Sequence, residues 1–221
     1  MCDVERYLSC LIYQLKRNFA SRLLYVGLQG SYLRGEASEC SDIDIMVVID
    51  ELKVDDLKSY RSILQSLEYF DKSCGFICSK IDLAHWNPLE ICHLLHSTRN
   101  YYGVLRDLVP TYTEQDIRNF VKISVNNLYH ELCHRYIHAD VEKNETHLPF
   151  SYKGVFYILQ NLYYLEHRIF IPTKVELLSV LNDKNRSVLQ RAIDLNNGLF
   201  FDFNESFELL FTWCQETLLK L

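Results

Sequence analysis

The chain has no excess of basic residues. Its 23 lysine and arginine residues are outnumbered by 29 aspartate and glutamate residues, which gives a formal net charge of −6 at pH 7. A protein that binds nucleic acid without sequence preference normally has a basic face and a high isoelectric point. We therefore expect no nucleic-acid partner, whereas a cationic small molecule is compatible with this charge.

Long hydrophobic runs are also absent. No uninterrupted apolar stretch approaches the roughly 18 residues that a membrane-spanning helix needs. The first six residues lack the basic region and apolar core of a secretory signal peptide. The eight cysteines are scattered and form no compact framework of the kind that small secreted proteins use. We expect reduced thiols and a cytoplasmic protein that does not contact a membrane.

Two well-known catalytic motifs are missing as well. The sequence has no G-x-x-x-x-G-K-[ST] loop, which disfavours a P-loop ATPase or kinase. It has no G-x-S-x-G elbow, which disfavours an α/β-hydrolase. Internal repeats and low-complexity segments are absent too, and 221 residues are enough to bury a substantial core.

Apolar periodicity divides the chain into two parts near residue 109. In residues 1–109 helical and strand-like patterns alternate, which indicates an α/β domain. Beyond this point the patterns are helical, which indicates a bundle. Residues 101–103 are predicted to end the helix that starts at Pro88, and the polar residues 140–149 to form a loop. The predicted strands are 23–28, 45–49 and 75–78, and the predicted helices are 4–19, 54–69, 88–98, 113–139, 151–168, 173–182, 184–195 and 204–220.

The most informative stretch runs from Gly30 to Asp44. Gly30 and Ser31 follow the apolar run of the first predicted strand, and Asp42 and Asp44 open the second. Side chains alternate along a strand, so the two carboxylates point the same way, roughly 7 Å apart. A glycine lets the backbone approach phosphates closely, and amide donors with the Ser31 hydroxyl can hold them. Two carboxylates suit Mg²⁺, which binds proteins through one or two carboxylates plus substrate phosphates.

Three short segments in this stretch resemble the signature of the DNA polymerase β-type nucleotidyltransferase superfamily: Gly30-Ser31, Arg34-Gly35 and Ser41-Asp42-Ile43-Asp44. Within that superfamily the chain is most similar to the small bacterial enzymes of the aminoglycoside nucleotidyltransferase kind. The resemblance covers roughly the first half of the chain. It implies an α/β (α+β) nucleotidyltransferase domain with a mixed sheet at residues 1–109, followed by an all-α helical bundle domain at residues 110–221.

The resemblance also implies roles for individual residues. Asp42 and Asp44 are the expected catalytic carboxylates and Mg²⁺ ligands. Arg34 is expected early in the helix after the Gly-Ser turn, within reach of phosphates, and Ser41 is expected to hydrogen-bond local backbone as well. The residues expected to bind the nucleotide are Gly30, Ser31, Arg34 and Ser41.

One part of the family pattern is missing. Relatives normally carry a third carboxylate on the next strand, as a metal ligand or as the general base for the acceptor hydroxyl. Here that strand, residues 74–78, contains no acid. The candidates for the role are Asp71 before the strand, Asp82 after it, and Glu131 in the helical half, because some relatives take their base from a helical domain.

A second motif competes for a functional interpretation. Residues 130–134 match the H-E-x-x-H pattern of zinc peptidases, with His130 and His134 as metal ligands and Glu131 as base, and His138 continues the same helix face. Zinc would need a third protein ligand and an open position. The pattern is short, so helix packing or contact with substrate are alternative roles for these histidines. A second group of ligand-like residues, Cys92, His93 and His96, lies on the helix predicted to start at Pro88 and is interpreted as structural.

The sequence therefore predicts a nucleotidyltransferase that uses Mg²⁺ to transfer a nucleoside monophosphate, AMP from ATP, to a hydroxyl of a small molecule. The nucleotide and an aminoglycoside-like or lincosamide-like acceptor, with antibiotic resistance as the biological role, are implied by the resemblance alone. Two alternatives stay open: nucleotidylation of a partner protein in a toxin-antitoxin pair, and a nucleotide-binding module whose catalysis has lapsed. A homodimer is a further expectation, because some relatives build their sites across a dimer.

Overall fold

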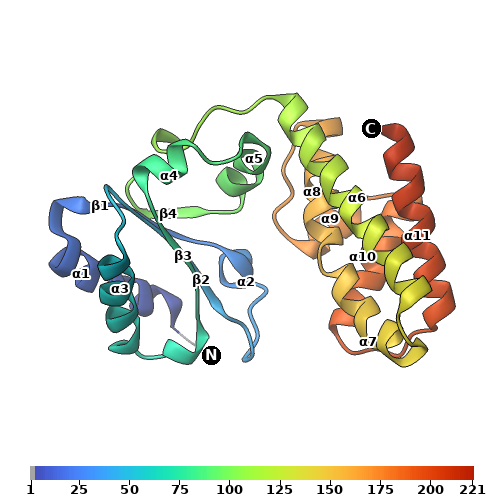
Figure 1. The fold of residues 1–221 in the computed structure, drawn as a ribbon, viewed down its shortest axis with the longest axis horizontal. Helices are drawn as coiled ribbons and strands as arrows, with labels where there is room; N and C mark the ends of the chain where they lie inside the picture. Colours follow the sequence, from blue (N-terminus) through green and yellow to red (C-terminus); the bar gives the residue numbers. More distant parts are fainter. Residues whose placement is uncertain (1–2) are drawn as a thin grey trace. The chain divides into compact units, whose positions relative to one another are not determined.

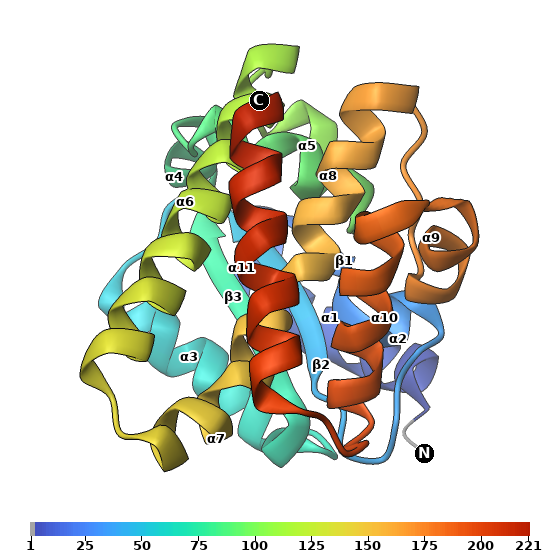
Figure 2. The ribbon, with the colours of Figure 1, turned by 90° about the vertical axis from the view of Figure 1, so that its right-hand side faces the viewer.

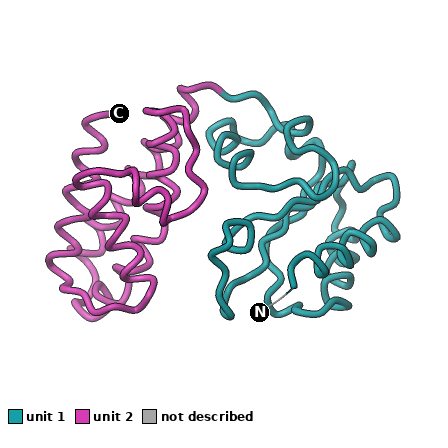
Figure 3. The backbone as a smooth tube through the Cα atoms, turned by 180° about the vertical axis from the view of Figure 1, so that it is seen from behind, with its two compact units in different colours: residues 1–112 teal, residues 113–221 magenta. Residues whose placement is uncertain are grey.

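The computed structural model describes residues 3–221, which form two compact units. The first unit is Met1–Tyr112 and the second is Thr113–Leu221, shown in separate colours in Figure 3. Each unit has its own buried core. Within residues 3–221, no helix combines the length and apolar character required to span a membrane.

The first unit is built on a mixed sheet, as the resemblance implies, but the sheet has four strands, one more than predicted (Figure 1). The strand order is β3-β2-β1-β4, in which β1 is antiparallel to both β2 and β4, whereas β2 and β3 run parallel. The strands are β1 (Leu23–Leu28), β2 (Ile43–Ile49), β3 (Ser73–Ser79) and β4 (Arg99–Tyr102).

Five α-helices accompany this sheet and cover its two faces with separate apolar clusters. One cluster packs α1 and α3 against the odd-numbered residues of β2, and the other packs the α4–α5 region against the even-numbered residues Met46 and Val48. Because side chains alternate between the two faces of a strand, different helices cover each face of β2. The helices are α1 (Val4–Phe19), α2 (Gly30–Arg34), α3 (Val54–Gln65), α4 (Lys80–Ala84) and α5 (Pro88–His96).

An arginine clamp fastens the sheet to α3. Arg22, just before β1, donates to both carboxylate oxygens of Asp56 at 2.9 Å and to Asp50 at 3.0 Å. Asp56 also accepts the backbone N–H of Lys53 at 2.9 Å, which caps the start of α3. This bidentate geometry is the strong form of an arginine–carboxylate pair, and it joins three chain segments at one point.

The second unit is a bundle of six helices in the described part of the chain. In Figure 2 the last helix, α11, lies between α6 and α10, and it contacts both. The buried Trp213 of α11 donates its indole N–H to Asn185 at 2.8 Å, and Tyr152 donates its hydroxyl to the carbonyl of Ser206 at 2.6 Å. The helices are α6 (Glu114–His138), α7 (Val141–Tyr152), α8 (Val155–His167), α9 (Lys174–Val180), α10 (Asp183–Asn196) and α11 (Phe203–Lys220).

Several predictions of local structure are wrong, and three of them concern a whole element or the position of a site residue. Residues 99–102 form β4 instead of the end of a helix, because α5 stops at His96 and the chain turns back to pair with β1. The predicted loop at 140–149 is the helix α7, which starts at Val141. Arg34 is the last residue of the five-residue helix α2 and not an early one, since Gly35 ends it in a left-handed conformation.

Candidate active site in the first unit

The centre of the candidate site is the contact between Gly30 and Asp44. The backbone N–H of Gln29 donates to the carbonyl of Asp44 at 2.9 Å, which holds the end of β1 beside the start of β2. Gly30 then adopts a φ of +69°, and an added Cβ would lie 1.9 Å from the Oδ2 atom of Asp44. Only glycine leaves room for that carboxylate and accepts this backbone conformation without strain.

Asp42 and Asp44 lie next to each other on the face of β2 that α4 and α5 cover further along. Partial burial raises the pKa of Asp44, and the charge of Asp42 raises it further, while a hydrogen bond with Cys74 and the charge of Arg34 oppose this effect. Asp42 is exposed and lies immediately before the strand. Two carboxylates that repel each other in a partly desolvated site are stabilised by a divalent cation. The donor set therefore fits Mg²⁺.

Ser31 and Arg34 stand beside this pair on α2. Within residues 3–221 the Ser31 hydroxyl makes no hydrogen bond, so it can donate to a ligand oxygen. The Nε atom of Arg34 donates to Glu36 at 2.9 Å, and its side chain is only 12% exposed. The ion pair orients the guanidinium group of Arg34. The positive charge of this group lowers the pKa of Asp44. This arrangement can bind anionic oxygens close to the two carboxylates.

Cys74 occupies the place where a third carboxylate would be expected. Strand β3 begins at Ser73, two residues earlier than predicted, and the parallel register pairs Cys74 with Asp44. Partial burial, the hydrogen bond to Asp44 and the nearby carboxylate charges raise the pKa of the Cys74 thiol. A thiol that stays protonated at neutral pH cannot accept a proton from an acceptor hydroxyl. The sheet therefore supplies two carboxylates and a thiol at this position.

The three acids considered for the missing role lie in different places. Asp82 caps α4 by accepting the amide and hydroxyl of Ser79, beyond the far end of β3, so the structure does not bring it to Asp44. Asp71 is exposed in the turn before β3. Glu131 lies on α6 in the second unit, where it forms an ion pair with Arg135 at 2.9 Å. Its catalytic role stays a prediction.

Ser41 has the local role that was expected for it. Its hydroxyl accepts the backbone N–H of Ser38 at 2.8 Å and lies 3.2 Å from the Ser38 hydroxyl. These bonds close the loop that leads into Asp42. A direct contact between Ser41 and a nucleotide stays a prediction.

His93 is the site neighbour that the sequence interpretation assigned to structure alone. It lies on α5, and burial together with the charge of Arg34 lowers the pKa of His93 to about 4. The imidazole is therefore neutral at pH 7 and adds no charge next to the arginine. A signal was present in the sequence, since Cys92, His93 and His96 lie together on one short helix, but only the fold shows that this helix approaches α2.

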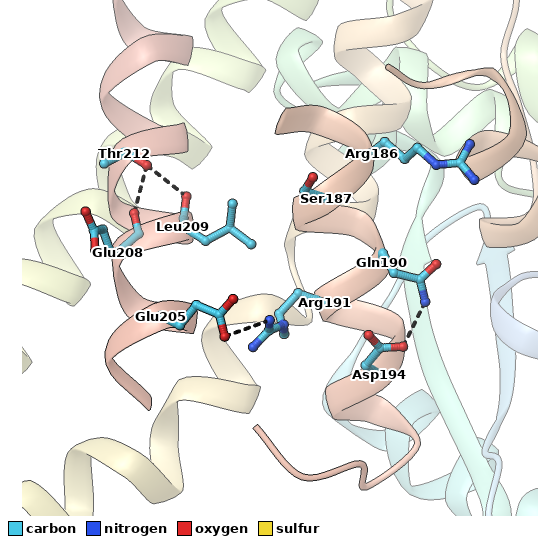
Figure 4. A pocket seen from close by; sticks show the side chains of 9 residues that line it. All are labelled: Arg186, Ser187, Gln190, Arg191, Asp194, Glu205, Glu208, Leu209 and Thr212. Carbon is cyan, nitrogen blue, oxygen red and sulfur yellow. Dashed lines mark hydrogen bonds and ion pairs between the residues drawn. The ribbon is translucent and has the colours of Figure 1, made fainter. Parts of the chain in front are cut away.

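One concave surface of the second unit contains none of the predicted site residues. A groove of about 590 Å³, lined mostly by polar and charged residues, lies between α10 and α11 (Figure 4). In it, Arg191 lies 3.5 Å from Glu205 and Gln190 donates to Asp194 at 2.8 Å. These charged groups already have partners, and the groove has no pair of carboxylates comparable with Asp42 and Asp44.

Comparisons with known proteins agree with the motif and the fold. Residues 13–99 match the family model described as polymerase beta, nucleotidyltransferase. An inferred protein adenylyltransferase from Methanocaldococcus jannaschii is 45% identical over 58 residues, which are 26% of this chain and 52% of that protein. The chain thus spans about half the length of this curated relative.

A solved structure extends the likeness to the second unit. The crystal structure of spectinomycin adenyltransferase AAD(9) from Enterococcus faecialis, with ATP and spectinomycin, aligns with a TM-score of 0.58 over 97% of this chain and 98% of that one. The two sequences are 16% identical, so this likeness concerns the fold. The family model confirms the resemblance that the residues from Gly30 to Asp44 carry, since it matches residues 13–99 as a nucleotidyltransferase domain of the polymerase beta type.

Proposed function

We propose that this chain transfers AMP from ATP to a hydroxyl group of a small molecule, with Mg²⁺ held by Asp42 and Asp44. The observation that carries the proposal is the packing of the Asp44 carboxylate against Gly30, where a Cβ would lie 1.9 Å from Oδ2. This packing puts the carboxylate beside the turn that also presents Ser31. The two ends of the motif, at Gly30 and at Asp44, therefore contact each other.

The proposed roles follow from the positions of the side chains. Asp42 and Asp44 would hold the cation, which when bound neutralises phosphate charge and orients the reacting groups. The Ser31 hydroxyl would donate to a phosphate oxygen of ATP, and Gly30 gives the backbone the close approach that this requires. Arg34 would stabilise negative charge that develops as pyrophosphate leaves. Ser41 would support the Asp42 loop and contact the nucleotide.

The general base of the proposed mechanism has to come from outside the sheet. Cys74 occupies the position beside Asp44, and its raised pKa keeps it protonated at neutral pH. We propose Glu131 for the role. Glu131 belongs to the proposed helical domain at residues 110–221, which follows the proposed catalytic domain at residues 1–109. Glu131→Gln should then lower the rate of transfer while leaving the affinity for ATP unchanged. Equal transfer by Glu131→Gln and the unaltered chain would exclude this assignment.

The acceptor is proposed to be a hydroxyl-bearing cationic antibiotic. The support is the fold of the spectinomycin adenyltransferase, whose solved structure contains ATP and spectinomycin, together with the net charge of −6. Antibiotic resistance would then be the biological role. Protein nucleotidylation is the second candidate, favoured by the archaeal relative described as a protein adenylyltransferase.

The decisive experiment is calorimetric titration with ATP and Mg²⁺, followed by incubation with radiolabelled ATP and a panel of acceptors. The unaltered chain should bind in a metal-dependent way, and the double variant Asp42→Asn with Asp44→Asn should not. Asp55→Asn is the matched control, because Asp55 is an exposed carboxylate on α3 whose side chain pairs with Lys58. Binding that survives the double variant would overturn the site.

The destination of the label separates the candidate functions. Label on a small molecule supports the first proposal, and label on a protein supports the second. Binding of ATP without release of pyrophosphate, under every acceptor tested, would mean that catalysis has lapsed. In that case Cys74→Asp, which restores a carboxylate beside Asp44, tests whether the missing acid is the cause.

A further inference from the structure

Three histidines line the outer face of α6. His130, His134 and His138 recur every fourth residue, so they lie on one side of the helix. All three are exposed, whereas the opposite side of α6 carries buried residues such as Leu128 and Leu132. The nucleotidyltransferase proposal gives these imidazoles no role.

The spacing of two of these rings already matches a shared metal ion. When two imidazoles bind one tetrahedral zinc ion at Zn–N distances of about 2.0–2.1 Å, their ring centroids lie about 5 Å apart. The centroids of His134 and His138 are 4.8 Å apart, with the ring planes tilted by 51°. The centroids of His130 and His134 are 6.0 Å apart, which is too far for a shared ion without movement.

The position along the helix also favours a cation. His138 is the last residue of α6, so the pair lies in its final turns. The final carbonyl groups of a helix lack helical partners, and this end carries partial negative charge. The nearby Arg135 forms an ion pair with Glu131 at 2.9 Å. Because this pairing offsets the positive charge of Arg135, the arginine repels a bound cation less than an unpaired arginine would.

We propose that His134 and His138 form a two-histidine chelate for a divalent transition-metal ion of the zinc class. Imidazole nitrogen suits Zn²⁺, Ni²⁺ and Cu²⁺, whereas Mg²⁺ prefers oxygen ligands. Within residues 3–221 no three His, Cys, Asp or Glu side chains are grouped to hold a metal, so the chain supplies two ligands and solvent completes the coordination. The chelate therefore differs from a zinc peptidase centre, in which His130 and His134 would be the pair.

The test is calorimetric titration of the metal-free full chain with Zn²⁺, in the presence of excess Mg²⁺. We expect one equivalent of Zn²⁺ to bind, and the variants His134→Asn and His138→Asn to weaken binding by on the order of tenfold or more. His130→Asn and His147→Asn are matched controls, because His130 lies on the same face outside chelating distance and His147 lies on α7. Both controls should bind like the unaltered chain.

A spectroscopic measurement checks the ligands directly. The electron paramagnetic resonance spectrum of bound Cu²⁺ should show coupling to two imidazole nitrogens, which His138→Asn reduces to one. The variant Asp42→Asn with Asp44→Asn should keep the Zn²⁺ site, which separates this inference from the proposed function. Absence of Zn²⁺ binding, binding that survives both His134→Asn and His138→Asn, or an equal loss in His130→Asn would overturn the proposal.

Discussion

Gly30 determines whether Asp44 can occupy its place, and two glycines with the same φ make this testable. Gly30 and Gly35 both have a φ of +69°, but an added Cβ meets the Asp44 carboxylate only at Gly30 and meets nothing within 4 Å at Gly35. Alanine at either position should cost roughly 1–3 kcal/mol of backbone strain. Gly30→Ala should in addition displace Asp44 and lower the transfer rate by on the order of 100-fold.

The two variants are compared by thermal unfolding and by ATP turnover. Similar losses of stability with a loss of turnover only in Gly30→Ala would support the contact described above. Equal turnover in the two variants would show that the position of Asp44 does not depend on Gly30.

The neutral state of His93 has a consequence for stability. Its pKa is lowered to about 4 in the folded chain, by burial first and by Arg34 second, whereas an unfolded histidine titrates near 6.5. Between about pH 6.5 and pH 4 the unfolded state therefore binds the proton more readily, and the folded state loses stability as the pH falls. His93→Leu should remove this part of the acid sensitivity.

Urea unfolding at several pH values between 4 and 7 measures the His93 effect. The difference in stability between His93→Leu and the unaltered chain should change across this interval and stay constant above it. The exposed His85 on the neighbouring segment provides the control substitution, His85→Leu. A constant difference at all pH values would mean that His93 is not held neutral.

At the scale of the element, the arginine clamp links the strands to α3 through charge. The hydrogen bonds from Arg22 lower the pKa of Asp56 to about 2, and the N–H of Lys53 contributes as well. The pKa of an unfolded aspartate is about 3.9. The stabilisation by Asp56 is therefore complete above about pH 4 and is lost as the pH falls toward 2.

Replacing Asp56 with asparagine should reveal this window. Asp56→Asn should unfold at a lower urea concentration than the unaltered chain at pH 7, and the two should converge as the pH falls from about 4 to about 2. The neighbour Asp55, whose carboxylate is exposed and pairs with Lys58 at 2.7 Å, gives the control Asp55→Asn. A gap that persists at pH 2 would mean that the Asp56 charge is not the stabilising part.

The elements differ in how far the sequence could predict them, and the reason is the source of their stability. Helix α1 and strand β1 were predicted with their observed bounds, because α1 has a strong helical apolar period and β1 is an uninterrupted apolar run. Strand β4 was missed, since its four residues have no such pattern and are ordered by pairing with β1. Helix α7 was missed because half of its buried residues are polar and Pro149 lies inside it.

The residues of the candidate site also differ in how far the sequence could predict them. Gly30 and Asp44 could be predicted because one short stretch contains them both, with a spacing that depends only on a turn and a strand. The positions of Cys74 and His93 depend on the register of β3 and on the packing of α5, which no local pattern contains. Tertiary contacts of this kind appear in the sequence only as isolated polar residues.

At the scale of the whole molecule, the two units have separate cores and should respond separately to damage. Leu11 is completely buried in the first unit and Leu210 in the second. Replacing either leucine with alanine should cost roughly 2–5 kcal/mol. Hydrogen exchange should show the loss of protection mainly in the unit that carries the substitution. An equal loss across both units would show that they unfold as one.

The order of the strands also determines how this protein should behave in concentrated solution. Strands β3 and β4 form the two edges of the sheet, and an edge strand is a template on which a second chain can add a strand. Strand β4 has only four residues and exposes Arg99 and Asn100, while β3 contains Gly75 with a φ of +107°. Short length, charge and an irregular backbone all hinder such pairing, so the folded protein should resist the strand-by-strand aggregation that ends in fibrils.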